Sequence, residues 1–355
     1  MCKRFYIFVI LVFIGLSLFA NAEFGNCLEF DGIDDYVSIP ANTDLNNPNF
    51  TVEFWIQLDN PNNWTGIIDK GRDSETDWYF LTGNTGYTEG VRFGVGSGSS
   101  RQETAYSWND TDWHHVAGTY DGFNMNLYVD GDLKSTNTAS MSNTTNNITF
   151  GARRGQSWFT NGKLDEIRIW ESVRTQDEIS DHRYLELNGN ETNLVGYWKL
   201  NSSSGTTSFD AANGHDGTLN NMSNDDWIGS EVPLGNVFNG TISSNTVWDK
   251  YMQIDGDVTI NDNVTLTVEP GVRIHFNGYY KFDVQGTVIA EGTETDSIKF
   301  TAHPDVPWNR IFFDNTSTAN DSSKFVHCLI ENSDGVNYLS NYNGGAFTII
   351  NYDKI

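Results

Sequence analysis

Hydrophobic and polar residues alternate in short runs through the N-terminal part of the chain, and turn-forming residues separate the runs. The clearest run is residues 50–58, in which hydrophobic side chains occupy every second position. This period of two predicts a β-strand with one dry face and one face toward water. Similar runs follow at residues 90–95, 113–120, 126–129, 147–150 and 164–170. Short strands at this spacing predict an antiparallel β-sandwich.

The central stretch of this pattern is residues 113–131, WHHVAGTYDGFNMNLYVDG. It contains two hydrophobic runs and two Asp-Gly pairs, at Asp121-Gly122 and Asp130-Gly131. Asp-Gly between alternating runs is a strong hairpin signal, because glycine adopts the positive φ of a tight turn without steric cost. We interpret the stretch as framework, since it contains no arrangement of a nucleophile or of an acid–base pair. A single short helix is predicted after it, where Thr175 and Glu178 have the spacing of a capping box.

Residues 113–131 resemble the central signature of the laminin-G-like, concanavalin-A-like jelly-roll domain. Further segments that are similar to this family follow its order, at residues 28–39, 50–56, 66–71, 162–170, 194–198 and 216–219. The resemblance covers residues 23–234 and implies a jelly-roll sandwich. It also implies a short helical segment near the predicted capping box, and a rim on which related domains commonly hold Ca²⁺.

From Asn236 onward, short hydrophobic runs recur at intervals of roughly twenty residues, which is typical of a stacked repeat. Segments 263–274, 286–292 and 298–301 resemble the opening coils of a right-handed parallel β-helix of the pectate-lyase-like superfold. The predicted fold class is therefore all-β, an antiparallel jelly-roll β-sandwich at 23–234 followed by a partial parallel β-helix at 235–355. Because a repeat array needs several coils and a polar cap at each end, we expect a fragment of a longer protein or poorly ordered last coils.

Residues 1–22 have the pattern of a signal peptide. Lys3 and Arg4 precede an apolar run, and a small-x-small cleavage site ends at Ala22. The alternative is a membrane anchor, for which the apolar run is short. We expect a secreted or cell-surface protein with no transmembrane segment after signal cleavage. Cys27 and Cys328, which follow the signal peptide, form no disulfide framework.

The chain has 21 basic and 47 acidic residues and a net charge of −26. This charge disfavours nucleic acid as a partner. It also supplies many oxygen atoms that could bind a hard cation. The candidate Ca²⁺ ligands are Asp31 and Asp34, which flank a glycine turn, and Asp165, in the second rim motif of the resembled family. The alternative is that the first motif is only a turn in which a carboxylate accepts hydrogen bonds from backbone amides.

Aromatic residues are abundant, with 11 Trp, 15 Tyr and 22 Phe. Tryptophans inside the recognised motifs are assigned to packing. Four tryptophans lie in turn-rich stretches outside them, and loops carry function on rigid β scaffolds. Trp64, Trp78, Trp108 and Trp158 are therefore the candidate ligand-binding residues, with Tyr87, Arg101 and Arg153 as candidate polar partners. The alternative is that these tryptophans only cover the edges of the sandwich.

No catalytic motif is evident, and the paired carboxylates of related glucanases are absent from residues 163–170. We expect a non-catalytic binding or adhesion protein. Its expected partner, bound by the jelly-roll loops, is a polysaccharide or a cell-surface glycan or protein. The alternative is an exported polysaccharide-degrading enzyme, a lyase or glycoside hydrolase, with the jelly roll as its carbohydrate-binding module. Fold resemblance carries these expectations, and one fold hosts many functions.

Overall fold

The fold is taken from a computed structural model of the chain. It describes residues 25–72, 75–83, 90–96, 101–141, 145–153, 157–232, 234–249, 251–302, 307–314, 320, 322–333 and 347–350. The predicted signal peptide lies outside the described residues, as does Tyr87. Within them, no helix is long and apolar enough to cross a membrane.

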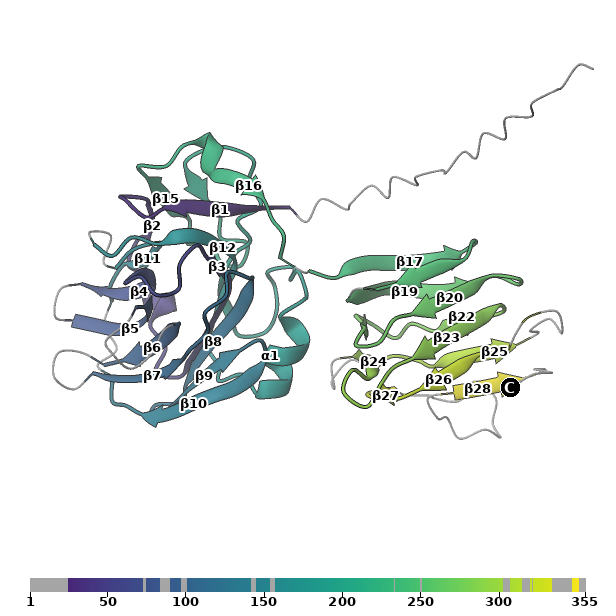
Figure 1. The fold of residues 1–355 in the computed structure, drawn as a ribbon. Coiled ribbons are helices and arrows are strands. Elements are labelled where there is room, and N and C mark those ends of the chain that lie inside the picture. The colour runs from purple at the N-terminus through teal and green to yellow at the C-terminus, as the bar shows by residue number, and fades with distance from the viewer. Residues whose placement is uncertain are drawn as a thin grey trace, which may run out of the picture.

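Two antiparallel sheets pack face to face in the N-terminal part (Figure 1). The first sheet has the order β10 (Asp132–Thr138), β9 (Asn124–Val129), β8 (His114–Tyr120), β3 (Phe50–Leu58), β12 (Asn161–Trp170), β1 (Asn26–Asp31) and β16 (Trp227–Gly229), and β13 (Leu194–Trp198) pairs with β12. The second sheet has the order β14 (Thr207–Ser208), β15 (Gly217–Asn220), β2 (Tyr36–Ile39), β11 (Ile148–Phe150), β4 (Gly66–Arg72), β5 (Glu75–Thr82), β6 (Val91–Val95) and β7 (Gln102–Tyr106). The prediction of an all-β chain with an antiparallel sandwich is confirmed.

Aromatic side chains from both sheets fill the space between them. Phe54 of the first sheet meets Phe80 of the second edge to face, with ring centroids 5.0 Å apart. Phe80 in turn stacks on Phe93, with centroids 4.8 Å apart. Both predicted hairpins are present, since β8 pairs with β9 and β9 pairs with β10. Short 3-10 turns cover the margins at Thr43–Leu45 and Asn224–Asp226.

The prediction that β3 turns one face to water is wrong. Thr51, Glu53 and Trp55 on its second face are as buried as the hydrophobic face, with at most 2% of each residue exposed. The cover is α1 (Gln176–His182) and the segment that follows it, which lie on the outer side of the first sheet (Figure 1). The predicted capping box is confirmed, because the Thr175 hydroxyl accepts a hydrogen bond from the Glu178 amide and the Glu178 carboxylate accepts one from the Thr175 amide.

After residue 235 the strands pair in parallel, and we call this part the parallel stack (Figure 1). One sheet contains β17 (Asn236–Ile242), β19 (Met252–Ile260), β21 (Arg273–Phe276), β22 (Phe282–Val284), β24 (Ile298–Ala302), β25 (Ile311–Asp314), β27 (Cys328–Ile330) and β28 (Phe347–Ile350). The other contains β18 (Thr246–Trp248), β20 (Thr265–Val268), β23 (Thr287–Glu291) and β26 (Lys324–Val326). These parallel ladders are consistent with the predicted β-helix and do not prove it.

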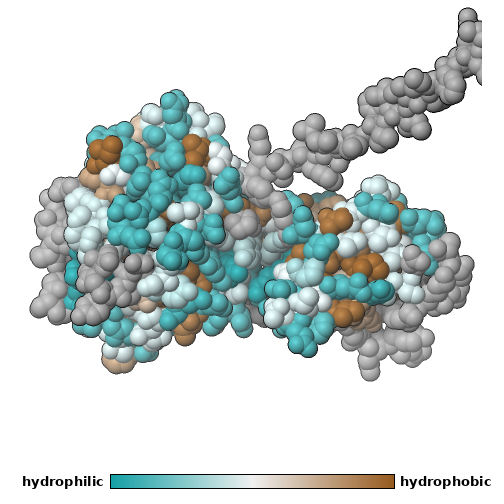
Figure 2. All heavy atoms as spheres, in the orientation of Figure 1, coloured by the Kyte–Doolittle hydropathy of each residue, from teal (hydrophilic) through white to brown (hydrophobic). Residues whose placement is uncertain are grey.

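The interior of the parallel stack is hydrophobic along its length. Inward residues lie beside their equivalents one coil later, as Met252 lies beside Ile274 and Ile274 beside Phe300. Trp308 is fully buried and stacks on Phe276, with ring centroids 4.1 Å apart and planes 8° apart. On the surface, the face shown in Figure 2 carries hydrophobic side chains on the stack, whereas the sandwich is mostly hydrophilic there.

Candidate functional site

Two of the four tryptophans predicted as ligand-binding residues lie side by side on the surface of the sandwich. Trp64 precedes β4 and Trp158 precedes β12, yet their ring centroids are 5.2 Å apart and their planes are tilted by 42°. Exposed fractions are 39% for Trp64 and 41% for Trp158. Large aromatic side chains are normally used in cores and interfaces, where they bury a large area. An exposed pair from two distant loops is therefore a candidate ligand platform, which we call the Trp64–Trp158 pair.

Guanidinium groups hold both rings in place. Arg92 lies over the Trp64 ring at 4.9 Å from its centroid, and Arg153 lies over the Trp158 ring at 4.6 Å. Such cation–π contacts are worth about 0.5–1 kcal/mol at exposed sites and more where water is excluded. Arg92 also donates a 2.6 Å hydrogen bond to the Gly83 carbonyl. A Cβ at Gly83 would lie 2.6 Å from the Trp64 ring, so the ring packs directly on the backbone there.

Trp158 has an unusual backbone conformation for a bulky residue, with φ +54°. The left-handed region costs on the order of 1–3 kcal/mol for a non-glycine residue, and such strain clusters at functional sites and ligand clamps. Glycine would adopt this conformation without strain. A tryptophan that is both strained and exposed contributes less to stability than a smaller residue could, which favours a role in binding.

A polar cluster lies next to the Trp64–Trp158 pair on the outer face of the second sheet. The Tyr79 hydroxyl donates a 2.5 Å hydrogen bond to Glu103, and burial together with this bond raises the pKa of Tyr79. Arg101 and Arg153 both lie over the Tyr79 ring, at 5.5 and 5.2 Å. The two arginines predicted as polar partners are thus brought together, and Arg153 connects this cluster to Trp158.

Trp78 and Trp108, the other two predicted ligand residues, belong to the core. Trp78 is 2% exposed and alternates with Tyr79 along β5, so it points inward against Phe50, with ring centroids 5.8 Å apart. Trp108 is 7% exposed and packs on His114 at 4.7 Å. Neither ring is presented on the surface, because turn-rich sequence around a tryptophan does not determine the side to which the ring points.

His114 is held between two carboxylates beside Trp108. Its Nδ1 lies 2.8 Å from Asp130 Oδ2, and its Nε2 lies 2.8 Å from Asp110 Oδ1. Burial alone would lower the pKa of His114, but the hydrogen bonds and charges of Asp130 and Asp110 outweigh burial and raise it. The His114 imidazole therefore links Asp110, in the segment before β8, to Asp130 in the β9–β10 turn.

This arrangement predicts a pH-dependent stability. A raised folded-state pKa gives a stabilisation that is fully present below the ordinary histidine value of 6.5 and is lost as pH rises through the raised value. Urea unfolding of the wild type and of His114→Gln between pH 5 and 9 should show a difference that shrinks with rising pH. A difference that stays constant over this range would contradict the prediction.

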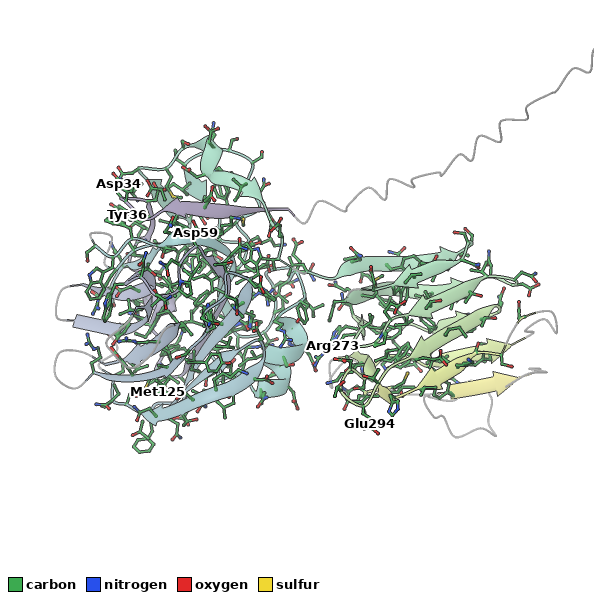
Figure 3. The ribbon with its side chains drawn as sticks, in the orientation of Figure 1. Asp34, Tyr36, Asp59, Met125, Arg273 and Glu294 are labelled. Atoms are coloured by element: carbon green, nitrogen blue, oxygen red, sulfur yellow. The ribbon has the colours of Figure 1, made fainter. Side chains whose placement is uncertain are left out.

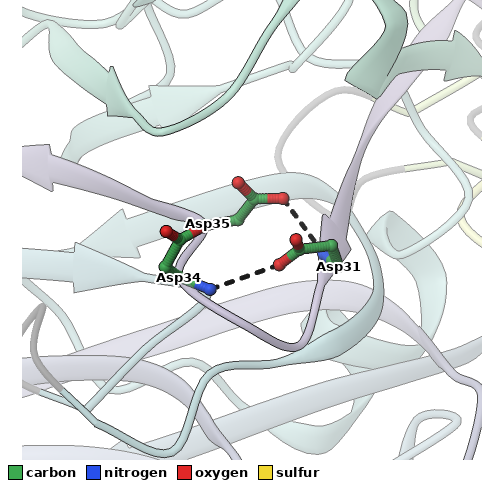
Figure 4. Close-up of side chains that lie close together, drawn as sticks. All are labelled: Asp31, Asp34 and Asp35. Atoms are coloured by element: carbon green, nitrogen blue, oxygen red, sulfur yellow. Dashed lines mark hydrogen bonds between the residues drawn. The ribbon is translucent and has the colours of Figure 1, made fainter.

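Three carboxylates meet at the turn between β1 and β2 (Figure 4). Ligand atoms of Asp31, Asp34 and Asp35 all lie within 4.8 Å of one another. The Asp31 carboxylate accepts from the amides of Ile33 and Asp34 at 2.7 and 3.3 Å, and Asp35 accepts from the Asp31 amide at 3.0 Å. Burial, together with the nearby charges of Asp31, Asp226 and Asp34, raises the pKa of Asp35 to about 6.

Asp165, the third predicted Ca²⁺ ligand, is not part of this cluster. It is 1% exposed in the middle of β12, where it accepts a 2.6 Å hydrogen bond from the Ser230 hydroxyl and a 2.9 Å bond from the Glu166 amide. Asp31 pairs with Asn161 of β12, and Asp165 lies four residues after Asn161 on that strand. Because a strand rises about 3.3 Å per residue, Asp165 is well separated from the Asp31 turn. Asp35, rather than Asp165, lies beside Asp31 and Asp34 in this cluster.

The N-terminal part is thus a β-sandwich of two packed antiparallel sheets with an exposed aromatic pair on its loops. Residues 31–180 match the family described as "Concanavalin A-like lectin/glucanases superfamily", and this range is less than half of the 355-residue chain. It confirms the resemblance seen in the sequence for the sandwich alone. No curated protein matches the chain.

Among solved structures, a Bacteroides ovatus protein proposed to bind carbohydrate is similar, at 21% identity and a TM-score of 0.45. The match covers 57% of this chain and 61% of that one, so the chain spans under two thirds of that relative. A pentraxin from Limulus polyphemus matches at 16% identity and a TM-score of 0.35, over 44% and 81%. Domain 4 of an extracellular arabinanase from Geobacillus stearothermophilus, solved with arabinotriose, matches at 17% and 0.35, over 41% and 70%. Similarity at this level assigns no ligand to this chain.

Proposed function

We propose that the chain is a non-catalytic binding protein of the cell exterior that takes a glycan on the Trp64–Trp158 pair. The observation that carries this proposal is the pairing of two exposed tryptophans, one of them with a strained backbone. Sugar rings present C–H faces that pack on aromatic rings, and loops on a rigid sheet scaffold are the usual place for such recognition. Arg101, with 39% of its side chain exposed, lies over the neighbouring Tyr79 ring and supplies donors for hydroxyl or carboxylate groups.

Titration of the whole chain with a panel of neutral and acidic polysaccharides tests this proposal. Tryptophan fluorescence and calorimetry should both report binding of at least one polysaccharide, and the same ligand should raise the melting temperature, because a ligand of the folded state stabilises it. If no polysaccharide on the panel binds, the proposal of a glycan ligand fails, and a protein partner becomes the better hypothesis.

We further propose that Asp31, Asp34 and Asp35 hold a Ca²⁺ ion. Calcium takes six to eight oxygen ligands, often mixing carboxylates with carbonyls and water. A turn that gathers three carboxylates fits this chemistry. A bound cation would also offset the repulsion and burial that raise the pKa of Asp35. Figure 3 places Asp34 at the side of the sandwich away from the parallel stack, so the ion would act on the sandwich alone.

Melting temperatures with Ca²⁺ and with chelator test the calcium proposal. Because the folded-state pKa of Asp35 exceeds its ordinary 3.8, the ionised carboxylate destabilises the metal-free protein as pH rises from 3.8 through about 6. In chelator at pH 7, Asp35→Asn should therefore melt higher than the wild type. Calcium should raise the melting temperature of the wild type and of a control, Asp59→Asn, but leave that of Asp35→Asn nearly unchanged. An unchanged wild type would remove the site.

The parallel stack is proposed to be the start of a right-handed parallel β-helix, and the chain to be exported by its first 22 residues. Support for the helix comes from the coil-to-coil parallel ladders, and support for export from the signal-peptide pattern. The polysaccharide-degrading alternative stays a prediction. Glu53 and Glu166, which share Arg168, are at most 1% exposed and so are closed to a polysaccharide.

A further inference from the structure

Four consecutive carbonyl groups, from the last residue of α1 to Leu185, accept hydrogen bonds. Arg168 donates to the carbonyls of His182, at 3.0 Å, and of Leu185. The Trp55 indole donates to the Arg183 carbonyl at 2.8 Å. Carbonyl groups at a helix C-terminus lack partners within the helix, and a cation there also complements the helix dipole. The first sheet therefore fixes the backbone of residues 182–185 firmly.

The fourth carbonyl, that of Tyr184, links the sandwich to the parallel stack. It accepts a 2.9 Å hydrogen bond from the Gly235 amide, the residue just before β17. The Tyr184 ring lies between Trp55 and Tyr251, with centroids 5.7 and 5.4 Å away. Tyr251 precedes β19 of the stack but is buried among sandwich residues, in a cluster with Trp170, Leu185, Leu187, Leu194 and Tyr197.

Further contacts surround these rings. His275 of β21 stacks on Tyr251, with ring centroids 6.5 Å apart, and meets His182 of α1 at 5.9 Å. Arg273 forms an ion pair with Asp181 of α1, and Figure 3 shows Arg273 on the side of the stack that faces the sandwich. Polar and aromatic contacts therefore reach the stack from both α1 and the segment behind it.

Two described residues of the connection between the two parts are buried. Val232 is fully buried and Leu234 is 9% exposed, and both pack against Trp55. Two domains move relative to each other when the linker between them is flexible and solvated and when their interface is small or polar. A connection whose apolar residues pack against an aromatic cluster instead restricts the relative motion of the two parts.

We infer that the sandwich and the parallel stack are held as one rigid, cooperatively unfolding unit by an aromatic joint made of Trp55, Tyr184, Gly235, Tyr251 and His275. Gly235 is the residue on which the joint depends most closely. A Cβ at this position would lie 2.0 Å from Tyr251 Cδ1, so only glycine lets the chain pass against the ring. The Trp64–Trp158 pair, which is the glycan site under the proposed function, is consequently held at a fixed angle to the parallel stack.

Calorimetry of the whole chain tests this inference. The wild type should unfold in a single transition with a ratio of calorimetric to van't Hoff enthalpy of about 1. Gly235→Ala should split the transition in two, because the added Cβ pushes Tyr251 out of the joint. Gly229→Ala is the matched control, since a Cβ there meets nothing within 4 Å and it should unfold as the wild type does.

Two separate transitions in the wild type would overturn the inference, as would a Gly235→Ala variant that keeps one transition at the wild-type temperature. Small-angle scattering of the wild type decides the matter even if Gly235→Ala does not fold. One fixed arrangement of the two parts should account for its scattering curve, whereas a curve that requires a spread of arrangements would contradict a rigid joint. Arg273→Gln, which removes only the ion pair to Asp181, should fold and broaden the transition.

Discussion

Replacing Trp64 and Trp158 together by alanine is expected to weaken binding of the identified polysaccharide about a hundredfold or more. Aromatic anchors at the centre of an interface commonly cost 2 kcal/mol or more each when truncated, and about 1.4 kcal/mol corresponds to a factor of ten. The fold should survive, since both rings are about 40% exposed. Calorimetric titration measures the loss, and Phe123→Ala, another exposed aromatic at the β8–β9 turn, should bind as the wild type does.

A second variant separates a binding role of Trp158 from a structural one. Trp158→Gly should abolish most of the binding while leaving the melting temperature unchanged or raising it, because glycine relieves the strain of φ +54°. If Trp158 were instead needed to cover the edge of the sandwich, this substitution would lower the melting temperature. That result, or unchanged binding by the double alanine variant, would count against the Trp64–Trp158 pair as the site.

Arg168→Met is expected to destabilise the protein by about 3–5 kcal/mol, the range for breaking a buried ion pair on one side. Arg168 is 1% exposed, donates a 2.7 Å hydrogen bond to Glu166 and lies 3.7 Å from Glu53. Burial alone would raise the pKa of Glu53, but hydrogen bonding to His115 and the charge of Arg168 keep it low. Methionine fills a similar volume yet leaves both carboxylates buried without their shared cation.

Urea unfolding measures this effect, and its pH dependence adds a check. Without Arg168 the buried glutamates are less stable when ionised, so the difference in unfolding free energy from the wild type should narrow as pH falls toward about 4.3, the ordinary glutamate pKa. Lys199→Met is the control. It removes a 2.8 Å ion pair to Glu186 that is exposed to water, and such pairs are worth about 0–1 kcal/mol. A loss of less than 1 kcal/mol in the free energy of unfolding for Arg168→Met would contradict a stabilising role for the buried ion pairs of Arg168 with Glu53 and Glu166.

Local patterns in the sequence were sufficient for the strands, the hairpins and the capped helix, because each depends on residues close along the chain. Residues 50–58 form β3 as predicted. Their second face was misjudged because its cover comes from α1, more than a hundred residues later. The local pattern predicts that Glu53 and Trp55 face water. In the structure, Glu53 contacts Arg168 and Trp170, and Trp55 donates a hydrogen bond to the Arg183 carbonyl. Burial of polar residues by a distant segment has no signature in a window of a few residues.

The two tryptophans of the candidate site were predictable from the sequence, but their contact with each other was not. Trp64 and Trp158 stood out as tryptophans outside recognised motifs, but their contact joins loops that lie far apart in sequence. Arg92 was missed although it occupies the outward position between Val91 and Phe93, which was a usable signal. Asp35 lies with Asp31 and Asp34 because the three are close along one turn, whereas the family resemblance favours Asp165, which lies in a different strand.

The aromatic joint also has a consequence for handling the sandwich by itself. A chain cut after Leu234 would lose Tyr251 and the Gly235 amide, so the Tyr184 ring and the apolar cluster that includes Leu187 would lose the ring that packs against them. An uncovered apolar patch of this kind is a site of self-association. The isolated sandwich would therefore tend to self-associate, and any apparent avidity for a polymer measured with it would reflect clustering as well as recognition.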